Sequence, residues 1–242
     1  MTYVEGFIIP VPRMNRDGFI QFSTIADELW TGHGAVRILE CWPDQHASVG
    51  IGDISTAARG KDGEAMVFSW IEWPDKAVRS QNISLLLAAM GADPRLDPAK
   101  QALLFDNDRI ISGCFRAIVE RGEPTPSPYV QGFVFPFADN QEAELYPFAE
   151  GIWDELRRGG AQRLLISCQD DFPEGRQIDF SVMAMAQRGE KVAFAFIEWP
   201  SRSVCEAAVH DIMSQRPLPF PVPFDQARMI AGGFCPIVVA AR

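Results

Sequence analysis

The sequence predicts an α+β protein made of two ferredoxin-like β-α-β-β-α-β repeats, whose sheets pack face to face as an intrachain pseudo-dimeric α/β barrel. Three observations lead to this prediction: an internal duplication, the order of elements within each copy, and a strand that is apolar on both faces. The chain has 242 residues, of which 47% are hydrophobic and 22% charged. This is an ordinary globular balance, and the chain is long enough to bury a large core.

Five segments of the first half return in the same order in the second half. Most of them keep an offset of 126 residues, as from Tyr3 to Tyr129, and the last keeps an offset of 119. The matching segments are 3–10 and 129–136, 34–35 and 160–161, 53–55 and 179–181, 71–74 and 197–200, and 105–109 and 224–228. We therefore interpret residues 1–120 and 129–242 as the two repeats, joined by a polar, proline-rich linker over 121–128.

Within the first repeat, β-branched and aromatic runs predict strands over 3–11, 35–42, 65–73 and 109–119. Apolar residues at helical spacing predict a helix that begins near Phe19 and ends at His33-Gly34. Asp53 and Asp75 are placed to cap a short helix and a second long helix. The second repeat is expected to follow the same series.

The third predicted strand indicates how the two sheets are covered. Phe68 and Trp70 point to one face of it, and Val67 and Ile71 point to the other. Both faces are apolar, so helices must cover one and the sheet of the other repeat must cover the second. This arrangement is an isologous homodimer within one chain, and it predicts a monomer.

Composition and motifs exclude several classes of function. The chain carries 22 basic and 32 acidic residues, a net charge of −10, which argues against nucleic acid and anionic membranes as partners. No apolar run is long enough to span a bilayer, and the N-terminus lacks a secretory pattern. The five cysteines are scattered and form no CxxC pair, as expected of reduced thiols in a cytoplasmic protein. Nucleotide-binding, zinc-binding and serine-hydrolase motifs are missing, so we expect neither a cofactor nor a metal site.

Several segments of the first half carry a resemblance to a known family. They are Tyr3-Val4-Glu5-Gly6-Phe7, residues 30–35, Glu40-Cys41, residues 68–71, residues 92–96 and residues 109–115. On these segments the chain resembles the YbaA-like bacterial family of unknown function, in the dimeric α/β-barrel superfamily. The second half matches more loosely, so the chain looks like a tandem fusion of two members. The resemblance implies the fold and a small cytoplasmic protein but no agreed activity, because the superfamily includes monooxygenases, isomerases, dismutases and haem-handling enzymes.

Charged residues at strand ends are the candidate catalytic residues. If the first and third strands run parallel, their ends share a sheet edge with the starts of the second and fourth. This would gather Glu72, Arg109 and His33 in the first repeat, and Glu198 and Arg228 in the second. Glu72 follows the aromatic face of its strand, where burial would raise the pKa of its carboxyl and suit it to act as a general base.

Each candidate also has a structural interpretation. Glu72 with Arg109 could be an ion pair that closes the barrel, and His33 could cap the end of its helix. The candidate ligand-binding residues are the ring-bearing ones on the same face of the third strand of each repeat, Phe68, Trp70, Phe194 and Phe196. These rings could equally be core.

The leading functional hypothesis is a small-molecule-binding barrel and, if an enzyme, a metal-free one acting on an apolar or aromatic metabolite. The alternative is a non-catalytic interaction or regulatory module whose barrel is filled by its own side chains. An interior cavity above roughly 300 Å³ would separate the first from the second. A third hypothesis is a haem-linked oxygenase with His33 or His210 as the iron ligand.

Overall fold

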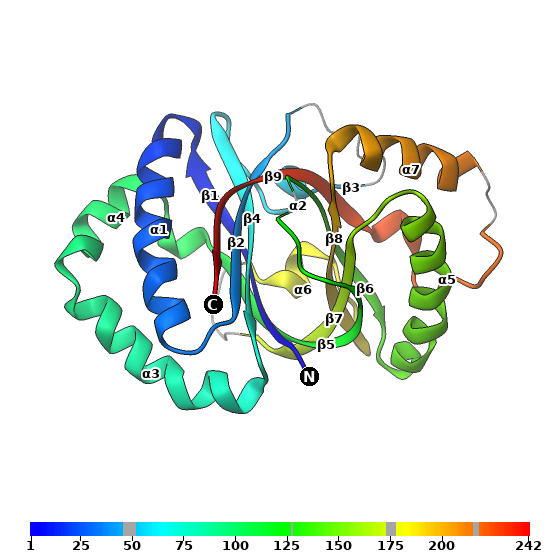
Figure 1. The fold of residues 1–242 in the computed structure, drawn as a ribbon, viewed down its shortest axis with the longest axis horizontal. Helices are drawn as coiled ribbons and strands as arrows, with labels where there is room; N and C mark the ends of the chain where they lie inside the picture. Colours follow the sequence, from blue (N-terminus) through cyan, green and yellow to red (C-terminus); the bar gives the residue numbers. More distant parts are fainter. Residues whose placement is uncertain (46–51, 127, 173–177, 215–217) are drawn as a thin grey trace.

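Eight long antiparallel strands form a closed barrel with helices on its outside (Figure 1). The computed structural model describes residues 1–45, 52–126, 128–172, 178–214 and 218–242. Neighbouring strands follow the order β2-β4-β1-β5-β7-β8-β6-β9, and β9 pairs with β2 to close the ring. The first four strands in this order come from the first half of the chain and the other four from the second half.

The first half begins with β1 (Tyr3–Pro12), α1 (Arg16–Gly32) and β2 (Arg37–Pro43). A short strand β3 (Gly52–Asp53) and a short helix α2 (Ile54–Ala57) precede β4 (Glu64–Trp73). The half continues with α3 (Lys76–Ala92), the 3-10 turn η2 (Pro94–Leu96) and α4 (Pro98–Leu104), and it ends with η3 (Asn107–Arg109) and β5 (Ile111–Gly122). The four predicted strands and both predicted caps are confirmed, since Asp53 and Asp75 accept from the amides of Thr56 and Val78.

In its described residues, the second half repeats this series without counterparts of β3, η2 and α4. It contains β6 (Tyr129–Ala138), α5 (Leu145–Arg158), β7 (Arg163–Asp171) and the short helix α6 (Phe180–Met183). β8 (Glu190–Trp199), α7 (Arg202–Ser214), η5 (Gln226–Arg228) and β9 (Ile230–Ala241) complete it. β5 runs two residues into the segment predicted as a linker.

The predicted direction of the strands is wrong. β1 pairs with β4 antiparallel, with Gly6 opposite Trp70, and β1 also pairs with β5 antiparallel. The reason lies in the connections: helix α1 returns the chain so that β1 and β2 point the same way, and β4 then pairs antiparallel with β2. The end of β4 and the start of β5 therefore lie at opposite ends of the barrel.

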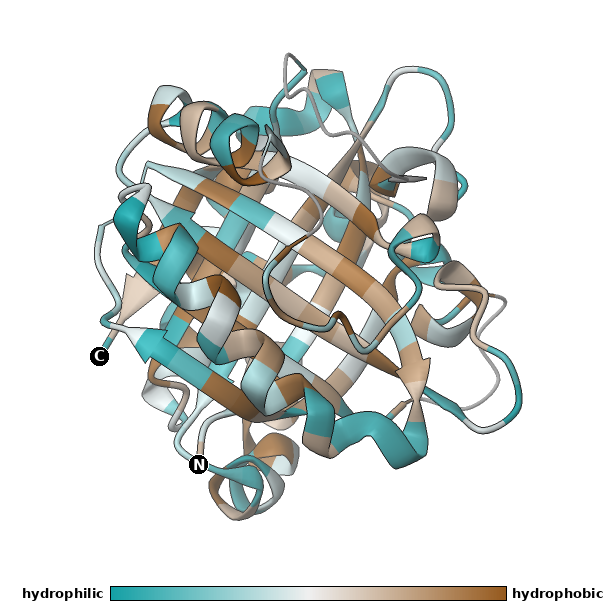
Figure 2. Ribbon diagram, turned by 90° about the vertical axis from the view of Figure 1, so that its right-hand side faces the viewer, coloured by the Kyte–Doolittle hydropathy of each residue, from teal (hydrophilic) through white to brown (hydrophobic). Residues whose placement is uncertain are grey.

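Aromatic rings from the two halves fill the barrel interior. Phe68 stacks on Phe194 with ring centroids 4.7 Å apart, and Trp70 stacks on Phe196 at 4.1 Å. All four side chains are fully buried. Figure 2 shows apolar residues along the barrel strands and hydrophilic residues on the outer parts of the helices. The interior is thus packed with the protein's own side chains.

Two glycines at equivalent positions give these rings their space. A Cβ placed on Gly6 would lie 2.9 Å from the Phe194 ring, and one on Gly132 would lie 2.7 Å from the Phe68 ring. The first strand of each half therefore packs against a phenylalanine ring of the other half. Outside the barrel, no helix in the described segments has the length and apolarity needed to cross a membrane.

We expect Gly132→Ala to lower the free energy of unfolding by about 1–3 kcal/mol, because the added methyl overpacks the Phe68 ring. Urea denaturation measures the change. Gly91→Ala in α3 is the matched control, because nothing lies within 4 Å of its Cβ position and alanine favours the helix. Equal stability of the two variants would contradict the tight packing of the interior.

Candidate functional site

A buried charge cluster lies where β2 begins beside the end of β4. The antiparallel register sets Arg37 opposite Glu72, and the same register in the second half sets Arg163 opposite Glu198. All four side chains are buried, with Arg163 and Glu198 completely inaccessible to solvent. Burial of four charged groups is unfavourable unless each of them is paired and hydrogen-bonded.

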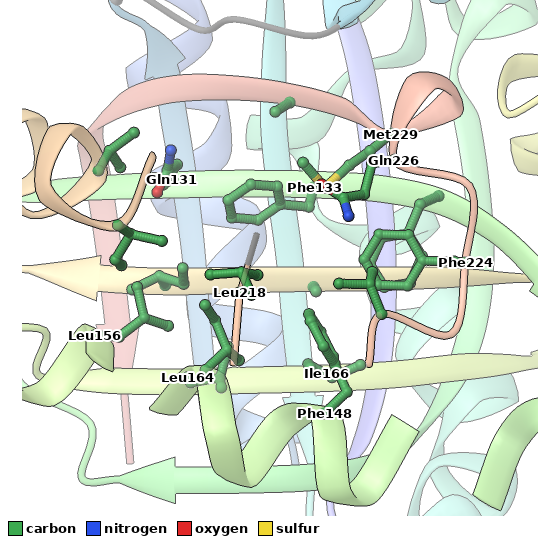
Figure 3. Close-up of a pocket in the computed structure, with 18 of the residues that line it drawn as sticks. Gln131, Phe133, Phe148, Leu156, Leu164, Ile166, Leu218, Phe224, Gln226 and Met229 are labelled. Atoms are coloured by element: carbon green, nitrogen blue, oxygen red, sulfur yellow. The ribbon is translucent and has the colours of Figure 1, made fainter. Parts of the chain in front are cut away.

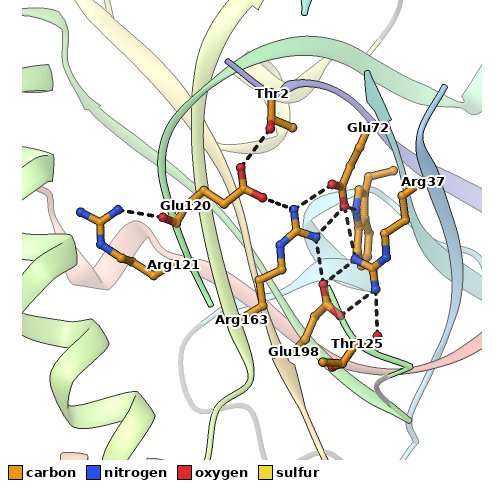
Figure 4. A network of polar contacts seen from close by, with 9 residues as sticks. Thr2, Arg37, Glu72, Glu120, Arg121, Thr125, Arg163 and Glu198 are labelled. Carbon is orange, nitrogen blue, oxygen red and sulfur yellow. Dashed lines mark hydrogen bonds and ion pairs between the residues drawn. The ribbon is translucent and has the colours of Figure 1, made fainter. Parts of the chain in front are cut away.

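The strongest bonds of this cluster cross between the two halves of the chain (Figure 4). Arg37 donates to both carboxylate oxygens of Glu198, at 2.6 and 2.7 Å. Arg163 donates to both oxygens of Glu72, at 2.7 Å each. The bonds within one half are longer, at 3.3 Å from Arg37 to Glu72 and 3.1 Å from Arg163 to Glu198. Two bidentate pairs therefore hold the halves together at this end of the barrel.

The surroundings keep the carboxylate of Glu72 ionised. Burial alone would raise its pKa, but the hydrogen bonds and charge of Arg163 lower it below the ordinary value, helped by the indole N–H of Trp70 at 2.9 Å and by Arg37. Burial likewise opposes the charge of Arg163, while Glu72, Glu120 and Glu198 raise the pKa of its guanidinium. A carboxylate held in this way is a poor general base, contrary to the predicted rise in pKa.

The structure separates the predicted catalytic residues. Arg109 bonds Glu64 at the start of β4, with 2.6 Å between Nη1 and Oε1, and Arg228 bonds Glu190 at the start of β8 in the same way. The predicted pairing of Glu72 and Glu198 with Arg109 and Arg228 is therefore wrong, because it assumed the wrong strand direction.

The arginines that do pair with these glutamates are not among the residues predicted from the sequence. Arg37 and Arg163 are related by the same offset of 126 residues as the two glutamates, and both begin the second strand of their half. An antiparallel assignment would have placed them beside the glutamates.

His33 lies at the C-terminal end of α1, where its Nδ1 is 2.7 Å from the carbonyl oxygen of Leu29. A carbonyl only accepts, so the imidazole donates this bond, to a carbonyl that also accepts the backbone N–H of His33 at 3.1 Å. His33 has no counterpart in the second half, where Gly159 occupies its position. A catalytic role for His33 stays a prediction, as does contact of the four interior aromatic residues with a ligand.

A cavity of about 190 Å³ lies outside the barrel, between the second-half sheet and helices α5 and α7 (Figure 3). Its walls are almost entirely apolar. They include Phe133 of β6, Ile166 of β7, Leu156 of α5 and Phe224 of the segment before η5. Two carboxamides, those of Gln131 and Gln226, are the polar side chains among the residues that line it.

In the first half the corresponding layer between helix and sheet contains an ion pair. Glu5, opposite Gln131 in the repeat, accepts two bonds of 2.8 Å from Arg79 and one of 3.2 Å from the indole of Trp73. Trp30 packs its ring against Trp73, with centroids 5.9 Å apart.

The second half replaces Glu5, Arg79 and Trp30 by smaller or uncharged residues, Gln131, Cys205 and Leu156. Trp199, which corresponds to Trp73, has an indole N–H without a partner among the described residues. A position-by-position comparison of the repeats could have located this cavity.

The described residues contain no group of three or more His, Cys, Asp or Glu side chains arranged to hold a metal ion. His46, one of the three histidines of the sequence, lies outside the residues that the structure describes.

The fold and both repeats correspond to known proteins. The profile of the family described as "Protein of unknown function (DUF1428)" matches residues 2–107 and again residues 128–226, so the chain belongs to this family and contains it twice. The uncharacterized protein YbaA of Escherichia coli (strain K12) is 33% identical over 120 residues, which is 50% of this chain and 99% of that protein.

Two crystal structures share the barrel fold over nearly the whole chain. A protein of Fusobacterium nucleatum, described as a candidate monooxygenase, has a TM-score of 0.54 at 7% identity, and covers 100% of this chain and 94% of its own. A second candidate monooxygenase, from Lactobacillus acidophilus, has a TM-score of 0.56 at 10% identity. The match covers 99% of this chain and 96% of that protein. At this low identity, both likenesses concern the fold alone.

We expect Glu72→Gln to cost about 3–5 kcal/mol of stability, because it leaves the buried guanidinium of Arg163 without its main counter-charge. For a chain of this length, the melting temperature should fall by roughly 10 °C. The pKa of Glu72 is lowered in the folded state, so its contribution is present above the usual value of 4.5 and is lost as the pH falls. The difference in the free energy of unfolding between wild type and Glu72→Gln should therefore become smaller below about pH 4.5.

Glu150→Gln is the control for this prediction, because Glu150 pairs with Arg121 on the surface, where both side chains are about half exposed. It should change stability by less than about 1 kcal/mol. A Glu72→Gln variant that melts like wild type would show that the cluster does not hold the barrel together.

Proposed function

We propose that the protein binds a small aromatic or other apolar molecule in the cavity between the second-half sheet and helices α5 and α7. The observation that carries this proposal is the cavity itself, which is roofed by helices and lined almost wholly by apolar side chains. Ligand sites in proteins combine such a lining with a few polar groups that orient the ligand. Gln131 and Gln226 supply those groups here.

The size of the cavity limits the ligand. Its volume of about 190 Å³ is close to that of an apolar cavity of roughly 150 Å³ that accepts benzene. One or two fused rings fit such a space. A carboxamide both donates and accepts, so a hydroxyl or carbonyl on the ring would find a partner in Gln131 or Gln226.

Two fold neighbours are described as candidate monooxygenases, but fold analogy alone supplies no oxidant at this cavity, so the proposal includes no chemical step. Glu72, Glu198, Arg109, Arg228 and His33 are not among the residues that line the cavity. The proposal therefore assigns binding to the cavity and leaves these five residues in the ion pairs and helix cap described above.

One observation favours a non-catalytic interaction or regulatory module instead. The barrel interior contains stacked rings, as this alternative requires, and the equivalent layer of the first half carries the Glu5–Arg79 ion pair.

The architecture supports three further proposals. Residues 1–120 and 129–242 are two ferredoxin-like repeats, with 121–128 between them, and their sheets meet in one barrel. The full chain is a monomer, because β5–β7 and β2–β9 pairing leaves neither half with a free edge at the seam. Its cysteines are unpaired, with Cys235 exposed, which fits a reducing cytoplasm.

Ligand binding is tested by thermal shift and calorimetry with indole, p-cresol and 1-naphthol as probes. A probe that binds the native state raises the melting temperature. Leu156→Trp installs the residue that the first half has at this position, Trp30, and should weaken binding at least about tenfold by filling the cavity. Leu103→Trp, at an exposed position of α4, is the control and should bind like wild type. Equal binding by Leu156→Trp, or no shift with any probe, would overturn the proposal.

The repeat proposal predicts the behaviour of residues 1–120 expressed alone. This half exposes the free edges of β2 and β5 and the interior rings, so it should self-associate and most simply form a dimeric barrel. Light scattering should give about twice the mass of the half, and 26.9 kDa for the full chain. A folded monomeric half would contradict the shared barrel, and a full chain of twice its own mass would contradict the monomer.

A further inference from the structure

Two buried carboxyl groups face the layer between α1 and the sheet of the first half. Asp27 lies on the inner side of α1 and is 3% exposed, and Glu40 lies on the outer face of β2 and is 7% exposed. One oxygen of each, Asp27 Oδ2 and Glu40 Oε2, has no hydrogen-bond partner among the described residues. The hydroxyl of Ser69 on β4 bonds the Glu40 carboxyl. Unpartnered buried carboxylate oxygens are costly, so this arrangement calls for an explanation.

Within the described segments, no basic side chain is paired with these two carboxyl groups. Arg37 points into the barrel, where it bonds Glu198, and Arg79 of α3 bonds Glu5 of β1. Arg95 of η2 bonds Asp93 and Glu28. The other titratable groups on α1 and on the elements packed against it are exposed, engaged or on the inner face: Arg13, Arg16, Asp17, His33, Cys41, Glu64, Glu72, Lys76, Lys100, Cys235 and Arg242.

We propose that Asp27 and Glu40 form a proton-binding site that retains at least one proton at neutral pH, and that this proton holds α1 against the barrel. A protonated carboxyl can donate, so one proton placed between the two groups satisfies an oxygen of each. It also avoids two adjacent negative charges in an apolar layer. Two carboxyl groups that share a site behave in this way because they cannot both ionise.

The electrostatics agree with the geometry. Burial raises the pKa of Asp27 from 3.8 to about 7. Burial, followed by the charge of Asp27, raises the pKa of Glu40 well above its ordinary value, against the opposing bond from Ser69. A raised pKa in the folded state stabilises the fold below the unfolded value and loses that effect as the pH rises through the folded value. Docking of α1 should therefore weaken between about pH 4 and pH 7.

The second half shows the same layer without the pair. Trp153 and Ile166 occupy the positions of Asp27 and Glu40, and Ala195 occupies that of Ser69. Ile166 there lines the open cavity. The acid pair is thus a feature of one repeat, at the place where the other repeat has an apolar ligand space, and it makes the first half the pH-sensitive one.

The test is a carbon-13 NMR titration of the carboxyl signals of the full chain, from pH 4 to pH 9. We expect at least one signal with a midpoint near 7. In Asp27→Asn one signal should disappear, and the midpoint of the Glu40 signal should fall because the neighbouring charge is gone. If every carboxyl signal of the wild type has finished titrating below about pH 5.5, the proposal is wrong, whether or not the variant folds.

A second measurement follows the stability. Between pH 4 and pH 8 the unfolding constant of the wild type should rise relative to that of Asp27→Asn by roughly 10²–10³-fold, tenfold for each pH unit of the window. Glu28→Gln is the control on the solvent side of α1, where the Glu28 side chain is 59% exposed. Its unfolding constant should change with pH in the same way as that of the wild type. An Asp27→Asn variant that also follows the wild type over this range would overturn the proposal.

Discussion

The exchange of charges between the two halves is the constraint on which the barrel depends. Arg37 and Arg163 each make their shorter, bidentate bonds to the glutamate of the other half. Buried charges are tolerated only in good geometry, so these bonds form in one relative placement of the halves. That placement also seats Phe194 against Gly6 and Phe68 against Gly132. A shift of one half against the other would lose both the ion pairs and the ring contacts.

Much of this fold could be predicted from the sequence because the same pattern of strands and helices occurs in both halves of the chain. The repeat of Tyr3 to Pro10 at residues 129–136, and the alternation around Phe68, were enough to predict two mated sheets with outer helices. The direction of the strands was predicted wrongly because the first and third strands were assumed to run parallel, although the sequence pattern itself was sufficient. The partners of Glu72 and Glu198 were missed for the same reason, although Arg37 and Arg163 repeat at the same offset.

The site was harder to predict, for a geometric reason. The alternation of Phe68 and Trp70 placed the candidate ligand site inside the barrel, but eight strands enclose a space that side chains just fill. The rings of Phe68 and Phe194 occupy it by stacking on each other. The apolar cavity described above lies instead under α5, where its existence depends on how Leu156 and its neighbours pack between helix and sheet. Periodicity places a side chain on a face and says nothing about the gap left above it.

The two regions also differ in their freedom to change after duplication. A substitution in the interior touches the other half directly, as Gly132 touches Phe68, so it needs a matching change across the pseudo-twofold axis. In the layer between helix and sheet of the first half, the buried polar groups find their partners within the same half: Glu5 meets Arg79 and Trp73, and Asp27 and Glu40 belong to α1 and β2. These polar partners can therefore change without a matching change in the other half. This explains why the interior and the charge cluster have kept their symmetry while one outer layer holds buried acids and the other an apolar cavity.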